Sequence, residues 1–187
     1  NIAIEALETA IPLIKKKSEK TYYQYVLAQW IEQSNPAAAI PHYINVRNNT
    51  KNEEVDYFAL QQIAKLYTEG KADGIDTTYL ENEFIKAGKS KLYGAQAHYV
   101  LASLQLQRKD TVKAFEHLLK SIQLSGTNAE QRALSLLKWG DISFLQSDYQ
   151  TATARYDSAM LVLPLTYPSH DSLENRKKNL QDLYRYF

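Results

Sequence analysis

The sequence predicts an all-α protein in which antiparallel helix pairs stack as a right-handed solenoid and a last helix covers the final pair. Three observations support this prediction. Only 6 Gly and 5 Pro occur among 187 residues, which favours long regular elements. Small and large apolar residues recur with helical spacing in successive segments. Residues that begin or end helices stand between these segments.

The pattern is clearest over residues 133–164. The small residues Gly140, Ala152 and Ala159 are spaced so that two antiparallel helices can approach closely, and Pro164 follows the second helix, which it cannot extend. Large apolar residues fill the space around them, namely Leu136, Trp139, Phe144, Tyr149 and Tyr156. The pattern resembles the tetratricopeptide repeat (TPR), a helix pair of about 34 residues.

The first elements follow this pattern loosely. Residues 1–17 resemble the second helix of a pair without its first helix, so we expect the natural protein to continue upstream of Asn1. Residues 21–50 form the next repeat. Its second helix begins at Asn35-Pro36, a helix cap followed by proline at the first helical position. Pro41 is expected to kink that helix or to delay its start.

The repeat over 53–88 has a first helix over 53–69 and a long turn over 70–76. Thr78 and Glu81 have the spacing of a capping box for its second helix, which is predicted to end at Gly88. The repeat over 95–128 is in register with the repeat over 133–166, since Ala95 and Ala133 lie 38 residues apart. The residues in register are Leu101, Ala102, Leu106, Asp110, Ala114, Leu118 and Ile122.

The last two elements have their own signals. Thr127 and Glu130 form a second capping box before the repeat over 133–166. A capping helix is predicted over 171–187, with Asp171 and Glu174 at its start. Its buried face comprises Leu173, Leu180, Leu183 and Tyr184, whereas Lys177, Lys178 and Arg185 lie outside. Solenoids need such a helix to cover their last apolar face.

Composition excludes several classes of protein. The chain has 22 Lys+Arg against 21 Asp+Glu, a net charge of +1 that gives no reason to expect nucleic-acid binding. It has no Cys, so disulfides, thiolate metal sites and Cys nucleophiles are excluded. No apolar run approaches the ~20 residues of a membrane span. Any targeting segment would lie outside this sequence.

The sequence predicts no enzyme, cofactor or metal site. His42, His98, His117 and His170 are not spaced as metal ligands. His98 and His117 could meet on paired helices, but we interpret them as separate polar residues on helix surfaces. No phosphate-binding glycine motif occurs. The carboxylate pairs Glu53-Glu54 and Glu81–Glu83 are interpreted as favourable charges at the starts of helices.

Two basic runs, Lys15-Lys16-Lys17 and Arg176-Lys177-Lys178, have no aromatic residues interleaved. We interpret each as a solvated helix end, with contact to a partner as the alternative.

The 14 Tyr divide into two groups. Tyr149 and Tyr156 occupy core positions of the repeat. Other Tyr residues lie at positions of the predicted first helices that would line a concave face. Aromatic residues at such positions are suited to protein recognition. The candidate protein-binding residues are Tyr22, Tyr25, Gln29, Phe58, Gln61, Lys65, Gln96, Tyr99 and Ser103. The alternative is that some of them pack under neighbouring helices. Only Lys65 suits a clamp for a peptide carboxylate, so no such clamp is predicted.

The segment from Tyr93 to Leu183 resembles the PorW/SprE family. The resemblance rests on Tyr156-Asp157-Ser158, Leu163-Pro164, Tyr167-Pro168 and Asn175-Arg176, with Leu180 and Leu183 beyond. The sequence departs from the family at Thr166 and His170, where an acidic residue and an aromatic residue are usual. These motifs have no catalytic content.

The PorW/SprE family comprises TPR lipoproteins of the Bacteroidetes type IX secretion system. The resemblance implies a scaffold on the periplasmic side of the outer membrane, held by a lipid anchor upstream of Asn1, whose partners are other secretion components in protein export and gliding. One rival is a generic TPR peptide-binding adaptor, and the sequence alone leaves a cytoplasmic location open. Another rival is a TPR-based enzyme regulator or carbohydrate-uptake lipoprotein.

Overall fold

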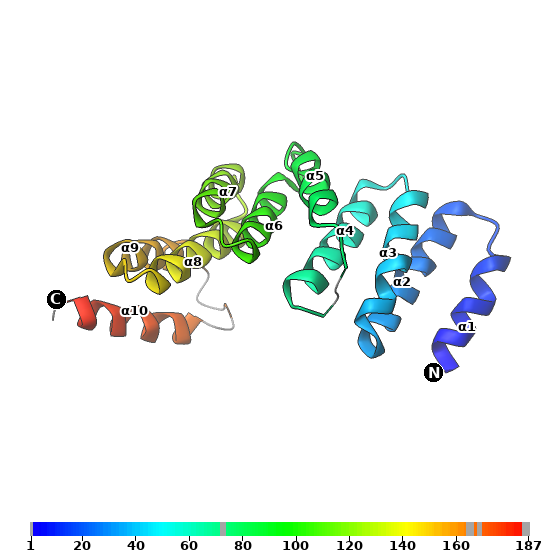
Figure 1. Cartoon of the computed structure of the whole chain (residues 1–187), viewed down its shortest axis with the longest axis horizontal. Coiled ribbons are helices and arrows are strands. Elements are labelled where there is room, and N and C mark those ends of the chain that lie inside the picture. Colours follow the sequence, from blue (N-terminus) through cyan, green and yellow to red (C-terminus); the bar gives the residue numbers. More distant parts are fainter. Residues whose placement is uncertain (1, 72–73, 164–166, 168–169, 185–187) are drawn as a thin grey trace. The chain divides into compact units, whose positions relative to one another are not determined.

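The computed structural model describes residues 2–71, 74–163, 167 and 170–184. This part of the chain forms ten α-helices and one short 3-10 helix and has no strand, so the predicted all-α fold of adjacent helix pairs is confirmed (Figure 1). The elements are α1 (Ile2–Ala10), η1 (Ile11–Leu13), α2 (Lys17–Ser34), α3 (Pro36–Asn49), α4 (Glu53–Thr68), α5 (Thr77–Ala87), α6 (Gly94–Gln107), α7 (Thr111–Leu124), α8 (Ala129–Leu145), α9 (Tyr149–Met160) and α10 (His170–Tyr184).

The chain divides into two compact units, Asn1–Glu83 and Phe84–Phe187. The boundary falls inside α5, between Glu83 and Phe84. Each unit has its own buried core. The single-domain organisation expected from the repeats stays a prediction.

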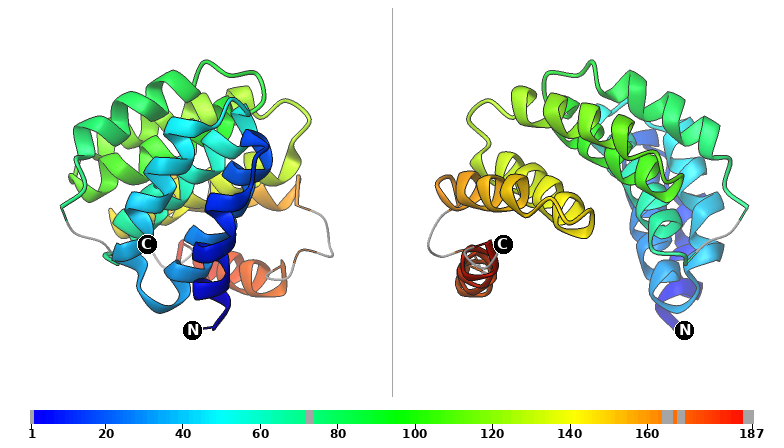
Figure 2. Two further views of the ribbon diagram at one scale, coloured as in Figure 1. Left: turned by 90° about the vertical axis from the view of Figure 1, so that its right-hand side faces the viewer. Right: turned by 60° about the vertical axis from the view of Figure 1, so that its left-hand side comes forward.

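In the first unit, α1 packs on α2, α2 on α3, and α3 on α4 (Figures 1 and 2). Large side chains that are fully buried in its core include Tyr43, Leu60, Ile63 and Leu66. Each buried side chain of this size stabilises the fold by about 1.5–3 kcal/mol. The described helix Ile2–Ala10 contributes no buried residue to this core.

Helix α3 begins at an Asn cap. The Asn35 side chain accepts a hydrogen bond of 3.1 Å from the backbone N–H of Ala38, as predicted. Helix α3 therefore begins at Pro36, and the delayed start considered for Pro41 is wrong, because the cap satisfies the first turn and Pro41 lies well inside the helix. Helix α2 begins at Lys17, four residues before the predicted start at Thr21.

Helix α5 begins differently from the prediction. Thr78 does not cap it. The Asp76 carboxylate accepts hydrogen bonds from the backbone N–H groups of Thr78 (2.8 Å) and Tyr79 (3.2 Å). Asp76 stands just before the helix and its carboxylate reaches these donors, whereas Thr78 lies inside the first turn. The predicted end at Gly88 is confirmed, since the Gly88 N–H bonds to the Phe84 carbonyl.

Buried Arg47 links three helices of the first unit. Its guanidinium donates to Asp56 of α4 (2.8 Å), to Glu83 of α5 (2.8 Å) and to the Tyr79 hydroxyl (2.7 Å), while only 7% of its side chain is exposed. Burial alone would lower the pKa of Arg47. The hydrogen bonds to Asp56 and Glu83 outweigh the effect of burial, so the pKa is raised. The dipole interpretation of Glu81 and Glu83 is therefore wrong, because neither lies in the first turn of α5 and Glu83 binds this arginine. Glu53 and Glu54 do lie in the first turn of α4.

In the second unit, α6 pairs with α7 and α8 with α9, while α7 also contacts α8. The small residues of the repeat pattern lie where these helices meet: Ala102, Ala114, Ala152 and Ala159 are fully buried. A Cβ atom on Gly140 would lie 3.1 Å from the Tyr156 ring. Gly140 thus permits the close approach of α8 and α9 that its position predicts.

Two turns in this unit are equivalent. Lys109 and Ser147 lie 38 residues apart, and both have positive φ values (61° and 62°). Each of them is followed by an Asp. The backbone N–H of this Asp donates to the carbonyl five residues earlier in the chain, and its side chain caps the next helix. Asp110 accepts from the N–H of Lys113, and Asp148 from that of Thr151, both at 3.0 Å. The loose and clear repeats therefore share one helix-turn-helix geometry.

Helix α8 begins at Ala129, and its cap is Asn128 rather than the predicted Thr127. The Asn128 side chain accepts from the N–H of Gln131 at 2.9 Å. A buried polar cluster follows. The Ser121 hydroxyl bonds to the Ala95 carbonyl (2.6 Å) and to the Ser135 hydroxyl (2.8 Å), joining α6, α7 and α8.

Helix α10 packs on α9, as predicted for a capping helix (Figures 1 and 2). Leu180 is 3% exposed and packs with Ala152 and Tyr156. Leu173 contacts a second cluster around Leu136 and Ala159. The helix begins at His170, one residue before the predicted start. Pro164, residues 185–187 and the side chains of Leu183, Tyr184 and Arg176 lie outside the described part.

Candidate binding surface

The nine candidate residues are divided between the two units. Six lie in the first unit, Tyr22, Tyr25 and Gln29 on α2 and Phe58, Gln61 and Lys65 on α4. Three lie in the second unit, Gln96, Tyr99 and Ser103 on α6.

On α2, only part of the predicted row is exposed. Tyr22 is 57% exposed, and its ring meets that of Tyr23 edge-on at 5.6 Å. Tyr25 is half-buried against the ring of Tyr43, with centroids 5.7 Å apart. Burial raises the pKa of the Tyr25 hydroxyl. Tyr22 is therefore available to a partner, whereas Tyr25 supports the core.

On α4, Phe58 is 38% exposed and tilts against the buried ring of Tyr57. Gln61 is half-buried and Lys65 is exposed. This row presents an apolar ring and an ammonium group along one helix, a combination that suits protein contacts.

A polar hollow of about 510 Å³, which we name the glutamine groove, adjoins Gln29 and Lys65. Its lining residues are Gln29, Glu32, Gln33, Pro36, Gln62, Lys65, Leu66 and Lys71. Its charges are already matched within the protein. Glu32 accepts a hydrogen bond from the Tyr43 hydroxyl and lies 3.8 Å from Lys65. Lys71 pairs with Glu69 at 2.7 Å.

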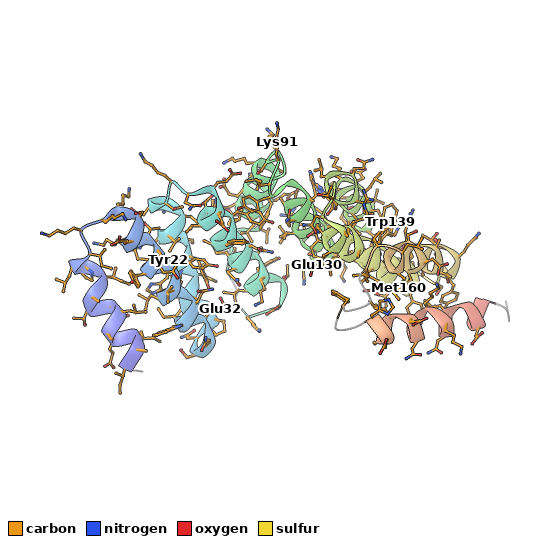
Figure 3. The ribbon with its side chains drawn as sticks, turned by 180° about the vertical axis from the view of Figure 1, so that it is seen from behind. Tyr22, Glu32, Lys91, Glu130, Trp139 and Met160 are labelled. Atoms are coloured by element: carbon orange, nitrogen blue, oxygen red, sulfur yellow. The ribbon has the colours of Figure 1, made fainter. Side chains whose placement is uncertain are left out.

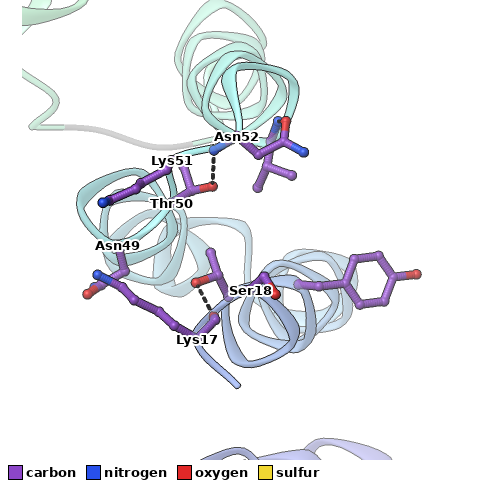
Figure 4. Close-up of a pocket in the computed structure, with 9 residues that line it drawn as sticks. Lys17, Ser18, Asn49, Thr50, Lys51 and Asn52 are labelled. Atoms are coloured by element: carbon purple, nitrogen blue, oxygen red, sulfur yellow. Dashed lines mark hydrogen bonds between the residues drawn. The ribbon is translucent and has the colours of Figure 1, made fainter. Parts of the chain in front are cut away.

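A second hollow of about 460 Å³ adjoins Tyr22, toward the other end of α2 from Glu32 (Figures 3 and 4). We name it the lysine pocket. It lies where the first turn of α2, the end of α3 and the loop before α4 meet. Its nine lining residues are Lys17, Ser18, Thr21, Tyr22, Asn49, Thr50, Lys51, Asn52 and Val55.

In the second unit, two of the three candidate residues, Tyr99 and Ser103, already have a partner from α8. The Lys138 ammonium lies 4.2 Å from the centroid of the Tyr99 ring and donates to the Ser103 hydroxyl at 2.6 Å. Burial raises the pKa of Tyr99 to about 12, and the nearby Asp141 adds to this shift. Gln96 is half-buried beside a hollow of about 240 Å³. These residues fit the alternative of packing under a neighbouring helix.

His98 and His117 are not separate surface residues, so that interpretation is wrong. Their Nδ1 atoms lie 3.0 Å apart, and the half-buried rings stack with centroids 5.2 Å apart. Pairing α6 with α7 brings the two residues together. Burial lowers the pKa of His98 to about 4, and His117 and Lys120 add to the effect.

One group of potential metal ligands lies at the start of α10. The ligand atoms of His170, Asp171 and Glu174 all lie within 4.8 Å of one another. Both carboxylates are exposed, and Asp171 lies in the first turn of the helix, where negative charge is favourable without any metal.

Sequence reasoning identified Tyr22 but missed the lysine pocket. It assigned Lys17 to a solvated basic run and gave Lys51 no role. Two chain segments, residues 17–22 and 49–55, assemble the pocket, and only the packing of α2 with α3 and α4 brings them together. One sequence signal could have indicated the pocket. Lys17 and Lys51 each stand near the start of a first helix, and these two helices are neighbours.

Two further observations bear on function. Within the described residues, none of the helices is both long and apolar enough for a membrane span. Compared with known proteins, the chain matches no family model and no curated protein.

Proposed function

We propose that this chain is a non-catalytic scaffold for protein–protein interactions and that its first unit carries the contact surface. One observation supports the proposal above all. Tyr22 and Phe58 are exposed on α2 and α4, Tyr22 lines the lysine pocket, and Gln29 and Lys65 on the same two helices line the glutamine groove. Exposed aromatic residues beside polar groups are typical of the residues that dominate protein interfaces.

We further propose that the helix pairs are TPR-like. The equivalent turns at Lys109 and Ser147 and the contact between Gly140 and Tyr156 support this part of the proposal. Arrays of such pairs present broad surfaces for proteins and peptides.

The proposed setting is type IX protein secretion, with the scaffold on the periplasmic side of the outer membrane and attached through a lipid outside this sequence. This part rests on the resemblance of Tyr93–Leu183 to the PorW/SprE family. The proposed partners are other components of the secretion machinery.

The proposal can be tested by capture from native cell envelopes followed by mass spectrometry. The bait is the chain itself, compared with the double variant Tyr22→Ala/Phe58→Ala. We expect the double variant to lose most of the captured partner, because aromatic contacts at an interface each contribute about 2 kcal/mol or more. Circular dichroism should be unchanged, since both side chains are exposed.

The matched control is Leu145→Ala/Leu161→Ala, which removes two exposed apolar side chains from the second unit. It should retain the partner. Equal capture by both double variants would contradict the placement of the surface on the first unit. Capture of proteins unrelated to secretion would contradict the proposed setting.

A generic peptide-binding adaptor is the second candidate function. The lysine pocket favours it, because about 460 Å³ lies within the range of about 300–1,000 Å³ typical of sites for small ligands. Partners that share one short linear segment, rather than one folded surface, would favour this candidate.

A further inference from the structure

We propose that the lysine pocket binds an acidic side chain next to an aromatic residue in an extended segment of a protein partner. This inference rests on the proposed function and specifies the chemistry of one part of its contact surface. Three features of the pocket support it: its charge, its apolar wall and its assembly from three helix ends.

The pocket carries unmatched positive charge. Its lining includes two lysines and no carboxylate. Lys17 comes from the first turn of α2 and Lys51 from the loop before α4, and both side chains extend over the side of the pocket where Asn49 lies (Figure 4). Both are exposed, and neither forms an ion pair within the described part of the chain. The adjacent Lys16, by contrast, pairs with Glu19 at 2.9 Å.

This arrangement favours a carboxylate from outside. Neither ammonium group has an acid of the pocket as its partner, so a carboxylate from outside can gain charge-assisted hydrogen bonds from them. The glutamine groove lacks this property, since Glu32 and Glu69 already neutralise its lysines.

The remaining wall favours an aromatic neighbour. Tyr22 presents an exposed ring, and the half-buried Val55 and the buried Thr21 complete that side. The Thr21 hydroxyl donates to the Lys17 carbonyl at 2.9 Å, and Thr50 accepts from the N–H of Asn52 at 3.1 Å (Figure 4). These internal bonds leave mainly carbon surface toward the pocket, against which an aromatic ring can pack.

A peptide fits these features better than a phosphate does. Many phosphate sites gather arginines or several converging backbone N–H groups, and lysine binds phosphate as a point charge without their bidentate geometry. The lysine pocket has no arginine in its lining, and the side chain of Asn52 already occupies the N–H groups of Glu54 and Val55. A carboxylate beside a ring matches the two ammonium groups and the tyrosine wall together.

The test is an NMR titration of the ¹⁵N-labelled full chain with two matched dipeptides, acetyl-Asp-Phe-amide and acetyl-Asn-Phe-amide. We expect the Asp peptide to shift backbone signals of residues 17–22 and 49–55. The Asn peptide should bind about three- to fivefold more weakly, as expected for ion pairs at an exposed site. The variant Lys17→Gln/Lys51→Gln should abolish this preference.

The matched control is Lys15→Gln/Lys89→Gln, which removes the same charge from two exposed lysines outside the pocket. It should keep the preference. Three outcomes would each overturn the inference: equal binding of both dipeptides, signal shifts confined to other residues, or an unchanged preference for the Asp peptide in the pocket variant. Inorganic phosphate that displaces the Asp peptide at equal concentration would reassign the pocket to anions in general. Binding to phosphatidylglycerol vesicles that the pocket variant abolishes would reassign it to a membrane surface.

These outcomes separate the inference from the proposed function. The variant Lys17→Gln/Lys51→Gln is also used as bait in the envelope capture. If the dipeptide preference fails while capture still depends on Tyr22 and Phe58, the scaffold proposal stands and only the acidic-peptide inference falls. If the preference holds and no partner is captured, the pocket binds peptides and the scaffold proposal falls.

Discussion

Gly140 illustrates at the scale of single residues how the repeat pattern specifies packing. A Cβ atom at this position would lie 3.1–3.3 Å from three atoms of the Tyr156 ring, which is itself buried. The ring is also fixed at its far end, since the Tyr156 hydroxyl donates to Asp141. It therefore has little freedom to move away from a larger residue.

We predict that Gly140→Leu destabilises the protein by about 1–3 kcal/mol, because it overpacks this contact. The measurement is chemical denaturation followed by circular dichroism. Gln150→Leu, an exposed position on α9, serves as the control and should change stability little. Unchanged stability in Gly140→Leu would contradict the close approach of α8 and α9.

The pair of His98 and His117 predicts a pH dependence of stability. Burial lowers the pKa of His98 to about 4, whereas its unfolded value is about 6.5. Between these values the unfolded chain binds a proton on His98 that the folded chain does not, so stability falls as pH falls from about 6.5 toward 4. His117 and Lys120 face the ring and make its protonation less favourable.

Denaturation at pH 7 and at pH 5 should reveal this loss, and His98→Asn should reduce it because the amide does not titrate. NMR titration of His98 gives an independent measurement. A His98 pKa near 6.5 in the folded protein would contradict the prediction.

At the scale of elements, the faces of helices were more predictable than their ends. Small residues such as Ala102 and Ala152 were placed correctly because helical spacing reports which face is buried. Helix caps were less predictable. Asp76 caps its helix two residues before the predicted Thr78, and Asn128 caps its helix one residue after the predicted Thr127. A sequence pattern does not show which of two neighbouring side chains will accept hydrogen bonds from the free backbone N–H groups at the start of a helix.

The candidate surface was predictable only in part for a similar reason. Tyr22 and Phe58 lie exposed on the predicted helices. The partners of Tyr99 and Ser103 were not foreseen, because Lys138 reaches them from α8. The contact between His98 and His117 and the lysine pocket likewise depend on how helices pair. Spacing along one helix does not contain that information.

The turns at Lys109 and Ser147 predict a stabilising change. Both residues have positive φ, a conformation that strains any side chain with a Cβ by about 1–2 kcal/mol. Glycine removes this strain but loses about 0.5–1 kcal/mol through its greater freedom in the unfolded chain. We therefore predict that Lys109→Gly and Ser147→Gly each stabilise the protein by about 0.5–1 kcal/mol.

Thermal melts measure this effect directly. Lys120→Gly, an exposed position within α7, is the control and should destabilise the protein by about 1 kcal/mol. If the two turn variants behaved like this control, the turns would not have the conformation described above.

At the scale of the molecule, each unit encloses its own core, and the second is completed by α10. Leu180 packs with Ala152 and Tyr156, and Leu173 packs beside Leu136 and Ala159. Lys177 also pairs with Asp157 of α9 at 2.7 Å. Helix α10 thus covers apolar side chains from both helices of the last pair.

We predict that deleting residues 171–187 exposes this apolar face and causes aggregation of the chain. Light scattering coupled to size-exclusion chromatography measures the effect. Leu180→Asp keeps the helix and tests the same contact more gently, since it places a charge in a buried apolar site. We expect it to lower the melting temperature, whereas Lys178→Gln, at an exposed position of α10, should leave the melting temperature unchanged. A deletion variant that stays monomeric and melts at the original temperature would show that α10 does not act as a cap.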